Sequence, residues 1–365
     1  MKMDFTPHRT RFFVAVGAAL LCAVGEGHVL ASPAPLATIV VSGRTMGTGY
    51  TVRVRCDPDL WTPTQLTDEV ERILGRIDAR MSSYRPGSEV SRFNRRQQSD
   101  WFAVSAESAA VVAAAQEISV ASGGALDVTA APLVNLWGFG AVRPDRLPPA
   151  PSELALVRRR VGHTRLSVRP SPPAIRKQWP DLEIDLSALA KGYALDVVAA
   201  RLGAMDIEHY LVEIGGEIKA GGRSERERPW RVGVESPSRS APSIGAVVAL
   251  DGNALATSGD YRNTVRAEGR RYCHIIDPRS GRPVEHDLAA ASVIHDSGMQ
   301  ADGWATALMV LGPEQALATA RRRGLAVRLV IRQGAGFIVR TTPPFQRWLL
   351  RDHLADSVGS RPAGG

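Results

Sequence analysis

Cysteine is scarce in this sequence of 365 residues, with only three in all, and no two of them form a Cys-x-x-Cys pair. The sequence also lacks His-Glu-x-x-His. These absences argue against a zinc site and against thiol redox chemistry. Neither the Gly-x-x-x-x-Gly-Lys loop nor the Gly-x-Gly-x-x-Gly fingerprint occurs. The P-loop and Rossmann classes of nucleotide site are therefore excluded.

A hydrophobic run long enough to span a bilayer comfortably is also missing. The apolar stretch of residues 12–24 is short and follows the basic residues His8, Arg9 and Arg11. With the small-residue site at 29–31, this pattern predicts a secretory signal over residues 1–31 and a periplasmic protein. Cys22 lacks the small residue that normally precedes a lipidated cysteine, so we expect cleavage rather than a lipid anchor. The export route stays open.

Long basic stripes are absent as well, although the formal net charge is +8. The arginines are scattered, and the short runs 158–160 and 321–323 lie at expected helix ends, where cations suit the dipole. We therefore expect no nucleic-acid partner. After signal cleavage only Cys56 and Cys273 remain, and they form one disulfide or none.

The rest of the chain predicts an α+β fold with mixed sheets and packed helices, in one large domain over residues 38–345 with a tail over 346–365. A helix beginning at Thr62-Pro63 has a regular apolar stripe, and Ser105 begins an Ala-rich helix that stops at Gly123. Segment 81–94 is rich in turn residues and predicts a surface loop. Strand patterns occupy residues 49–55, 209–214, 230–235, 245–251, 254–257, 289–294, 325–331 and 336–340.

The stretch 183–202 carries the first chemical signal. Its alternation at the start predicts a short strand, and Ser187 is a suitable N-cap for the helix that follows. Lys191 lies near the helix start, where the dipole disfavours a cation, and Gly192 weakens the helix. Both residues fit an anion bound at this N-terminus, with Asp185 binding a hydroxyl or amine of the same ligand. The alternative is an ordinary strand–turn–helix with a solvated lysine.

The second signal is a helix over residues 301–310. Asp302 and Thr306 are four residues apart in the sequence, so they share a helix face. A carboxylate, a hydroxyl and a nearby carbonyl are hard oxygen donors that suit Mg²⁺. Alternatively, Asp302 caps its helix and Thr306 only packs. Together the two signals describe a metal and a helix start that meet on one pyrophosphate.

Several motifs, in this order, resemble those of the ApbE family, the FAD:protein FMN transferases. The resemblance covers about residues 45–312. The motifs are Met46-Gly-Thr, Met81-Ser-Ser-Tyr-Arg-Pro-Gly-Ser-Glu-Val-Ser-Arg-Phe-Asn94, Gly124-Ala-Leu-Asp-Val-Thr129, Ile184-Asp-Leu-Ser-Ala-Leu-Ala-Lys-Gly-Tyr193, Ser258-Gly-Asp-Tyr261, His274-Ile-Ile-Asp-Pro278 and Ala301-Asp-Gly-Trp-Ala-Thr306.

The resemblance implies an ApbE-type fold and Mg²⁺-dependent transfer of FMN from FAD to a Thr or Ser hydroxyl of an exported protein, with AMP leaving. It assigns the metal to Ala188, Asp302 and Thr306. One departure is Glu213-Ile-Gly-Gly-Glu-Ile, where the family more often has Asn before Gly-Gly and Asn or Asp after it. The residues implied to contact FAD are Met46, Tyr84, Ala125, Leu126, Asp127, Asp185, Lys191 and Ile275.

Phosphoryl transfer depends mainly on positioning and charge stabilisation, which Lys191 and the metal would supply. Asp302 is a hypothetical base for the incoming hydroxyl, although a metal ligand has a depressed pKa and is a poor base. Two other functions stay open: an FAD pyrophosphatase, and a non-catalytic flavin-binding maturation factor. An exported respiratory electron-transfer subunit is one candidate acceptor.

Overall fold

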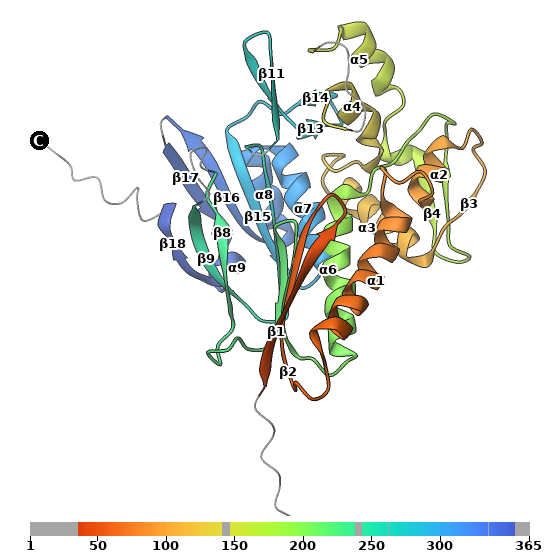
Figure 1. The fold of residues 1–365 in the computed structure, drawn as a ribbon. Coiled ribbons are helices and arrows are strands. Elements are labelled where there is room, and N and C mark those ends of the chain that lie inside the picture. Colours follow the sequence, from red (N-terminus) through yellow and green to blue (C-terminus); the bar gives the residue numbers. More distant parts are fainter. Residues whose placement is uncertain (1–35, 141–146, 238–242, 262, 335, 355–365) are drawn as a thin grey trace, which may run out of the picture. The chain divides into compact units, whose positions relative to one another are not determined.

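The computed structural model describes residues 36–140, 147–237, 243–261, 263–334 and 336–354. These residues belong to one compact unit that begins at Leu36 (Figure 1). The predicted signal, residues 1–31, lies outside the described residues. Among the described helices, none combines the length and apolar character that crossing a bilayer requires.

The centre of the fold is an antiparallel sheet of eight strands. It runs in the order β1 (Ala37–Thr45), β2 (Thr48–Cys56), β6 (His209–Ile214), β7 (Glu217–Gly221), β10 (Asn253–Gly259), β15 (Leu288–His295), β16 (Ala326–Gln333) and β17 (Gly336–Thr341).

The smaller sheets and hairpins use β3 (Phe102–Ala103), β4 (Leu166–Arg169), β5 (Ala174–Lys177), β8 (Trp230–Glu235), β9 (Ile244–Leu250), β11 (Thr264–Ala267), β12 (Arg270–Cys273), β13 (Ile276–Asp277), β14 (Arg282–Pro283) and β18 (Leu349–Asp352). A second sheet has the order β18-β9-β8, and a third has the order β3-β5-β4.

Helices cover one face of the large sheet, and the sheet β18-β9-β8 covers part of the other (Figure 1). Antiparallel sheets with separate helices confirm the α+β prediction. The helices are α1 (Pro63–Met81), α2 (Glu89–Arg95), α3 (Ala106–Ala121), α4 (Ala131–Leu136), α5 (Pro151–Arg158), α6 (Ser187–Gly203), α7 (Gly298–Leu311), α8 (Pro313–Arg323) and α9 (Pro343–Gln346).

The helix predicted at Thr62-Pro63 is α1, and its apolar stripe is buried as predicted. Thr62 and Gln65 form a reciprocal capping box at its start. Ser105 caps α3, which ends before Gly123 as expected. The buried stripe of α1 consists of Leu66, Val70, Ile73, Leu74, Ile77 and Met81.

Two local predictions are wrong. The segment 81–94 is not a loop throughout, because α2 begins at Glu89 with Ser88 as its N-cap. Residues 183–186 alternate in burial, but they form no strand, and Asp185 makes a single backbone bond to the Val128 carbonyl. The polar, turn-rich composition of residues 81–94 gives no sequence signal for the short capped helix α2.

Two open questions have structural answers. Cys56 and Cys273 are buried free thiols, so the unpaired alternative holds. Part of the tail expected at 346–365 belongs to the fold, since β18 pairs with β9.

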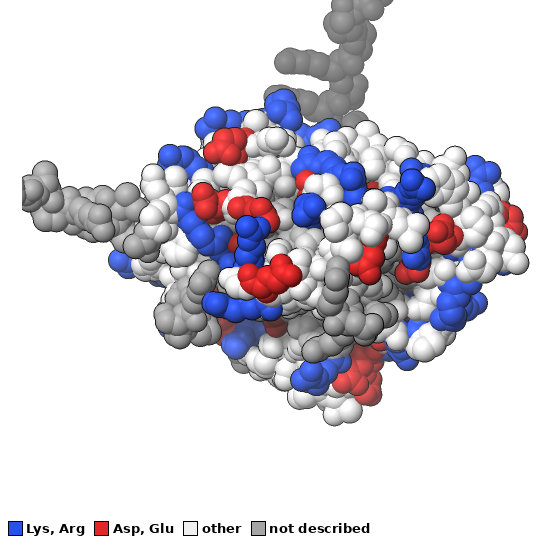
Figure 2. Space-filling view, turned by 90° about the horizontal axis from the view of Figure 1, so that it is seen from above, with Lys and Arg blue, Asp and Glu red and all other residues white. Residues whose placement is uncertain are grey.

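Positive and negative side chains lie interspersed on the face in Figure 2, without a continuous basic field.

Candidate active site

Two adjoining cavities lie beside the start of α6. The main cavity, of about 400 Å³, is bordered by α7, β10 and the segments 125–131 and 274–278. The side cavity, of about 540 Å³, is bordered by Met46 and the loop 81–85. Tyr84, Asp185, Ser187 and Lys191 line both cavities, so the two share a wall.

The structure brings every predicted site residue to these cavities. Met46 lines the side cavity, from the two-residue turn of the β1–β2 hairpin, where Met46 and Gly47 both have positive φ. The remaining predicted residues line the main cavity: Tyr84, Ala125, Leu126, Asp127, Asp185, Ala188, Lys191, Ile275, Asp302 and Thr306.

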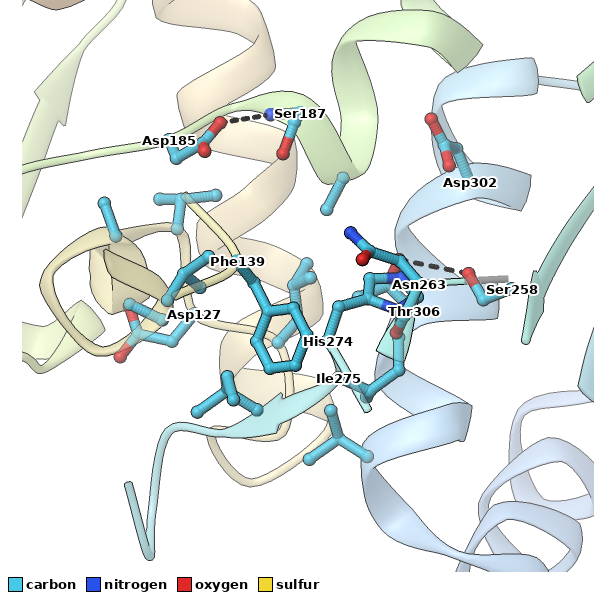
Figure 3. A pocket seen from close by; sticks show the side chains of 18 of the residues that line it. Asp127, Phe139, Asp185, Ser187, Ser258, Asn263, His274, Ile275, Asp302 and Thr306 are labelled. Carbon is cyan, nitrogen blue, oxygen red and sulfur yellow. Dashed lines mark hydrogen bonds between the residues drawn. The ribbon is translucent and has the colours of Figure 1, made fainter. Parts of the chain in front are cut away.

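Asp302 projects from α7 toward the start of α6 (Figure 3). Only 2% of it is exposed. Its Oδ2 accepts a bond from the Gly192 N–H at 3.1 Å and lies 3.5 Å from Lys191 Nζ. Burial raises the pKa of Asp302, while Lys191 and the Gly192 amide oppose that rise. Ser297 caps α7, so the alternative of Asp302 as a helix cap is wrong.

Lys191 lies between two carboxylates. Its Nζ is 3.7 Å from Glu217 Oε1 and also donates to the Ser187 carbonyl at 3.3 Å. Burial lowers the pKa of Lys191, but Asp302 and Glu217 outweigh this effect and raise the pKa overall. The lysine is therefore a permanent cation at the cavity wall.

Two expectations for the start of α6 are wrong. Ser187 is the first helical residue rather than the N-cap, and Leu186 holds the cap position without a side-chain bond. The Ser187 N–H instead donates to Asp185 Oδ1 at 2.9 Å (Figure 3). Gly192 does not serve ligand approach, because a Cβ there would lie 2.1 Å from the Gly298 carbonyl oxygen. Close contact between α6 and α7 requires this glycine.

Asp127 lines the cavity, but its carboxylate already has protein partners. Oδ1 accepts from the amide and hydroxyl of Thr129, and Oδ2 accepts from the His163 N–H. In Figure 3 the carboxylate points away from the centre of the cavity. Asp127 therefore shapes the wall formed by residues 125–131.

Sequence reasoning missed several lining residues, including Glu217, Asn263 and His274. Ser258 and His274 occur in quoted motifs, which was the available signal. The Ser258 and Thr306 hydroxyls are 3.3 Å apart. Trp137 is buried in packing, whereas Phe139 both packs and lines the main cavity.

His274 has a defined environment. Its Nδ1 is 3.2 Å from the Asn263 carbonyl oxygen. A carbonyl can only accept, so Nδ1 carries the proton and Nε2 has the free lone pair. Burial lowers the pKa of His274. The imidazole is therefore neutral at physiological pH and able to accept a proton.

The donors around Asp302 fit a hard divalent cation. Within the described residues, no cluster of three or more His, Cys, Asp or Glu side chains could hold a metal ion. A metal here would therefore depend on the Asp302 carboxylate, the Thr306 hydroxyl and the Ala188 carbonyl, completed by water or phosphate oxygens. This all-oxygen set with one carboxylate is typical of Mg²⁺.

Known proteins share this architecture. The sequence profile of the ApbE family matches residues 46–329. An FAD:protein FMN transferase of Vibrio cholerae is 40% identical over 316 residues, covering 86% of this chain and 94% of the relative.

Solved structures agree. The flavin transferase ApbE from Vibrio cholerae superposes with a TM-score of 0.79 at 40% identity, over 86% of this chain and all of that one. The apo flavinyl transferase ApbE of Pseudomonas stutzeri gives 0.79 at 41% identity, over 87% and 98% of the two chains. The chain therefore belongs to the ApbE family.

Proposed function

We propose that this protein is an Mg²⁺-dependent FAD:protein FMN transferase that acts on an exported acceptor in the periplasm. The observation that carries the proposal is the convergence of Ala188 and Lys191 on α6 with Asp302 and Thr306 on α7 at one cavity. The names of the relatives supply the flavin and the protein acceptor.

The proposed reaction replaces the phosphoanhydride bond of FAD with a phosphoester bond to the acceptor. The hydroxyl oxygen of an acceptor Thr or Ser attacks the phosphorus of the FMN half of FAD. The bond from that phosphorus to the bridging oxygen breaks, and AMP leaves with that oxygen. The proton of the hydroxyl passes to a base, so atoms and charges balance.

The residues divide this work. Asp302, Thr306 and the Ala188 carbonyl would hold Mg²⁺, which when bound neutralises charge on the pyrophosphate. Lys191 adds a fixed positive charge at the same place. His274 is a better base than Asp302, because Asp302 is the proposed metal ligand and a ligand is a poor base. The neutral imidazole lines the same cavity with Nε2 unprotonated.

The test is direct. The protein is mixed with FAD, MgCl₂ and candidate exported acceptors, including respiratory electron-transfer subunits. We expect a fluorescent acceptor band that survives denaturing electrophoresis, and we expect EDTA to prevent its formation. The same mixture without acceptor separates the alternatives. FMN and AMP accumulating at a catalytic rate would identify an FAD pyrophosphatase, and flavin binding unaffected by EDTA would identify a non-catalytic binding factor.

A further inference from the structure

The two halves of the proposed metal site lie on separate helices that touch at their backbones. Helices α6 and α7 lie side by side (Figure 1). A Cβ on Gly298 would lie 2.6 Å from the Gly192 carbonyl oxygen, so neither position accepts a side chain. Such contact fixes the distance between the helices but does not prevent α7 from sliding or turning.

Asp196 supplies that constraint. It lies one turn beyond Gly192 on α6, and its carboxylate receives the start of α7. Its Oδ1 accepts from the Gly298 N–H at 2.8 Å, and its Oδ2 accepts from the Met299 N–H at 3.1 Å and the Ser297 hydroxyl at 2.7 Å. The first amides of a helix have no partner within it, and the dipole favours a carboxylate there.

Two oxygens bound to successive amides fix both the axial position and the rotation of α7. Asp302 lies four residues after Gly298, and Thr306 lies four residues further. A helix rises about 1.5 Å per residue and transmits a shift at its start to these positions. Lys219 of β7 joins the same carboxylate at 2.7 Å, and β7 also carries Glu217 beside Lys191.

We propose that Asp196 is a positioning residue for the active site. Its carboxylate holds α7 in the register at which Asp302 and Thr306 face Ala188 and Lys191. Asp196 lines neither the main cavity nor the side cavity, so it acts through the helix and not on the ligand. The inference rests on the proposed function for the identity of the site.

The test is Asp196→Asn, which keeps the size of the side chain but turns one acceptor oxygen into a donor. Binding of MnCl₂ to the FAD-loaded protein is measured by calorimetry, and binding of FAD in EDTA by fluorescence quenching. The affinity for Mn²⁺ should fall about tenfold or more, as for other groups that orient metal ligands. FAD affinity in EDTA should stay within about twofold, because most residues that line the two cavities lie outside α7.

Glu89→Gln is the matched control. Glu89 accepts from Ser105 and Ser108 at the start of α3, and no residue of α3 lines either cavity. Glu89→Gln should lower the melting temperature of the protein without changing its affinity for Mn²⁺. Unchanged Mn²⁺ affinity in Asp196→Asn, or an equal loss in Glu89→Gln, would overturn the proposal.

If Asp196→Asn does not fold, Ser297→Ala removes one of the three α7 bonds and should give a smaller loss in the same direction. Unchanged Mn²⁺ affinity in that variant would count against the proposal. Wild-type protein that binds FAD and Mn²⁺ but transfers no flavin would contradict the proposed function alone. Wild-type protein without Mn²⁺ binding would contradict both.

Discussion

Among single residues, Asp302 has an environment that a neutral side chain cannot reproduce. It is buried, it accepts from Gly192, and it lies beside the cation of Lys191. Asp302→Asn should lower Mg²⁺-dependent flavin transfer at least about a hundredfold, as expected when a charge-stabilising group is lost from an active site. Transfer rates measured over a MgCl₂ titration test this. Glu314→Gln, at an exposed position of α8, is the control, and full activity of Asp302→Asn would remove that carboxylate from the reaction.

Asn94 is a second residue with a specific role. Its side-chain amide donates to the Ile184 carbonyl at 2.9 Å and accepts from the Ile184 N–H at 2.8 Å. Asn94→Ala leaves both backbone groups without these bonds, at a cost of about 1–3 kcal/mol for each buried group. Denaturant unfolding should show that loss, and FAD affinity should fall because Asp185 is the next residue. Gln97→Ala, nearby and exposed, should change neither quantity.

Between elements, two glycine-to-alanine substitutions should change stability in opposite directions, one at the contact of α6 with α7 and one on α1. Gly192→Ala places a Cβ against the Gly298 backbone and should destabilise the protein by about 1–3 kcal/mol or more. Gly75→Ala, on the exposed side of α1 with open space around it, should stabilise by about 0.5–1 kcal/mol. Thermal and denaturant unfolding measure both changes. Equal effects of the two substitutions would show that the helices can separate at little cost.

Glu69 joins α1 to α6 and predicts a pH dependence. Hydrogen bonds from Arg72 and Arg201 lower the pKa of Glu69 to about 2 against the opposing effect of burial. Glu69 binds a proton less readily in the folded protein than in the unfolded chain. Its contribution to the free energy of unfolding is therefore complete above about pH 4.5 and is lost as the pH falls toward 2. Acid unfolding of Glu69→Gln should therefore be less pH-dependent in that window than that of the wild type. Asp68→Asn, at the exposed neighbouring position, should behave like the wild type.

The sequence predicted the elements whose local signals agreed with their packing. In α1 the apolar stripe and the cap point to the same helix, so the predicted start and buried face are correct. In α3 the cap Ser105 and the glycine at 123 correctly mark the two ends of the helix. At the start of α6 local signals conflicted with the tertiary structure. Ser187 has the chemistry of a cap, but Asp185 already binds its amide. Gly192 is explained by Gly298, a residue more than a hundred positions away that no local pattern reveals.

Across the whole molecule, a buried ion pair links the C-terminal strand to the central sheet, in addition to its pairing with β9. Arg328 has no exposed surface, and its Nε and Nη2 donate to the two oxygens of Asp352 on β18. Asp352→Asn leaves a buried charge without its counter-ion and should destabilise the protein by about 3–5 kcal/mol. Denaturant unfolding measures this, with the exposed neighbour Arg351→Gln as the control. A loss below about 0.5 kcal/mol, typical of surface substitutions, would contradict the assignment.

The assembly of the candidate site depends on topology more than on local pattern. Lys191 and Asp302 are 111 residues apart, and nothing in their spacing brings them together. Their proximity follows from the packing of α6 against α7, and only the ordered motifs of the family indicated it beforehand. Glu217 lay in the stretch that departs from the family pattern, so the resemblance gave it no role although it lies beside Lys191.

The glycine contact between α6 and α7 limits how this enzyme can move. Where two backbones already touch, compression cannot bring them closer, since protein interiors are close-packed and barely compressible. The two helices can therefore separate, slide or turn at this point, but they cannot move closer together. Binding and release of a ligand must be accommodated without shortening the distance between these two helices.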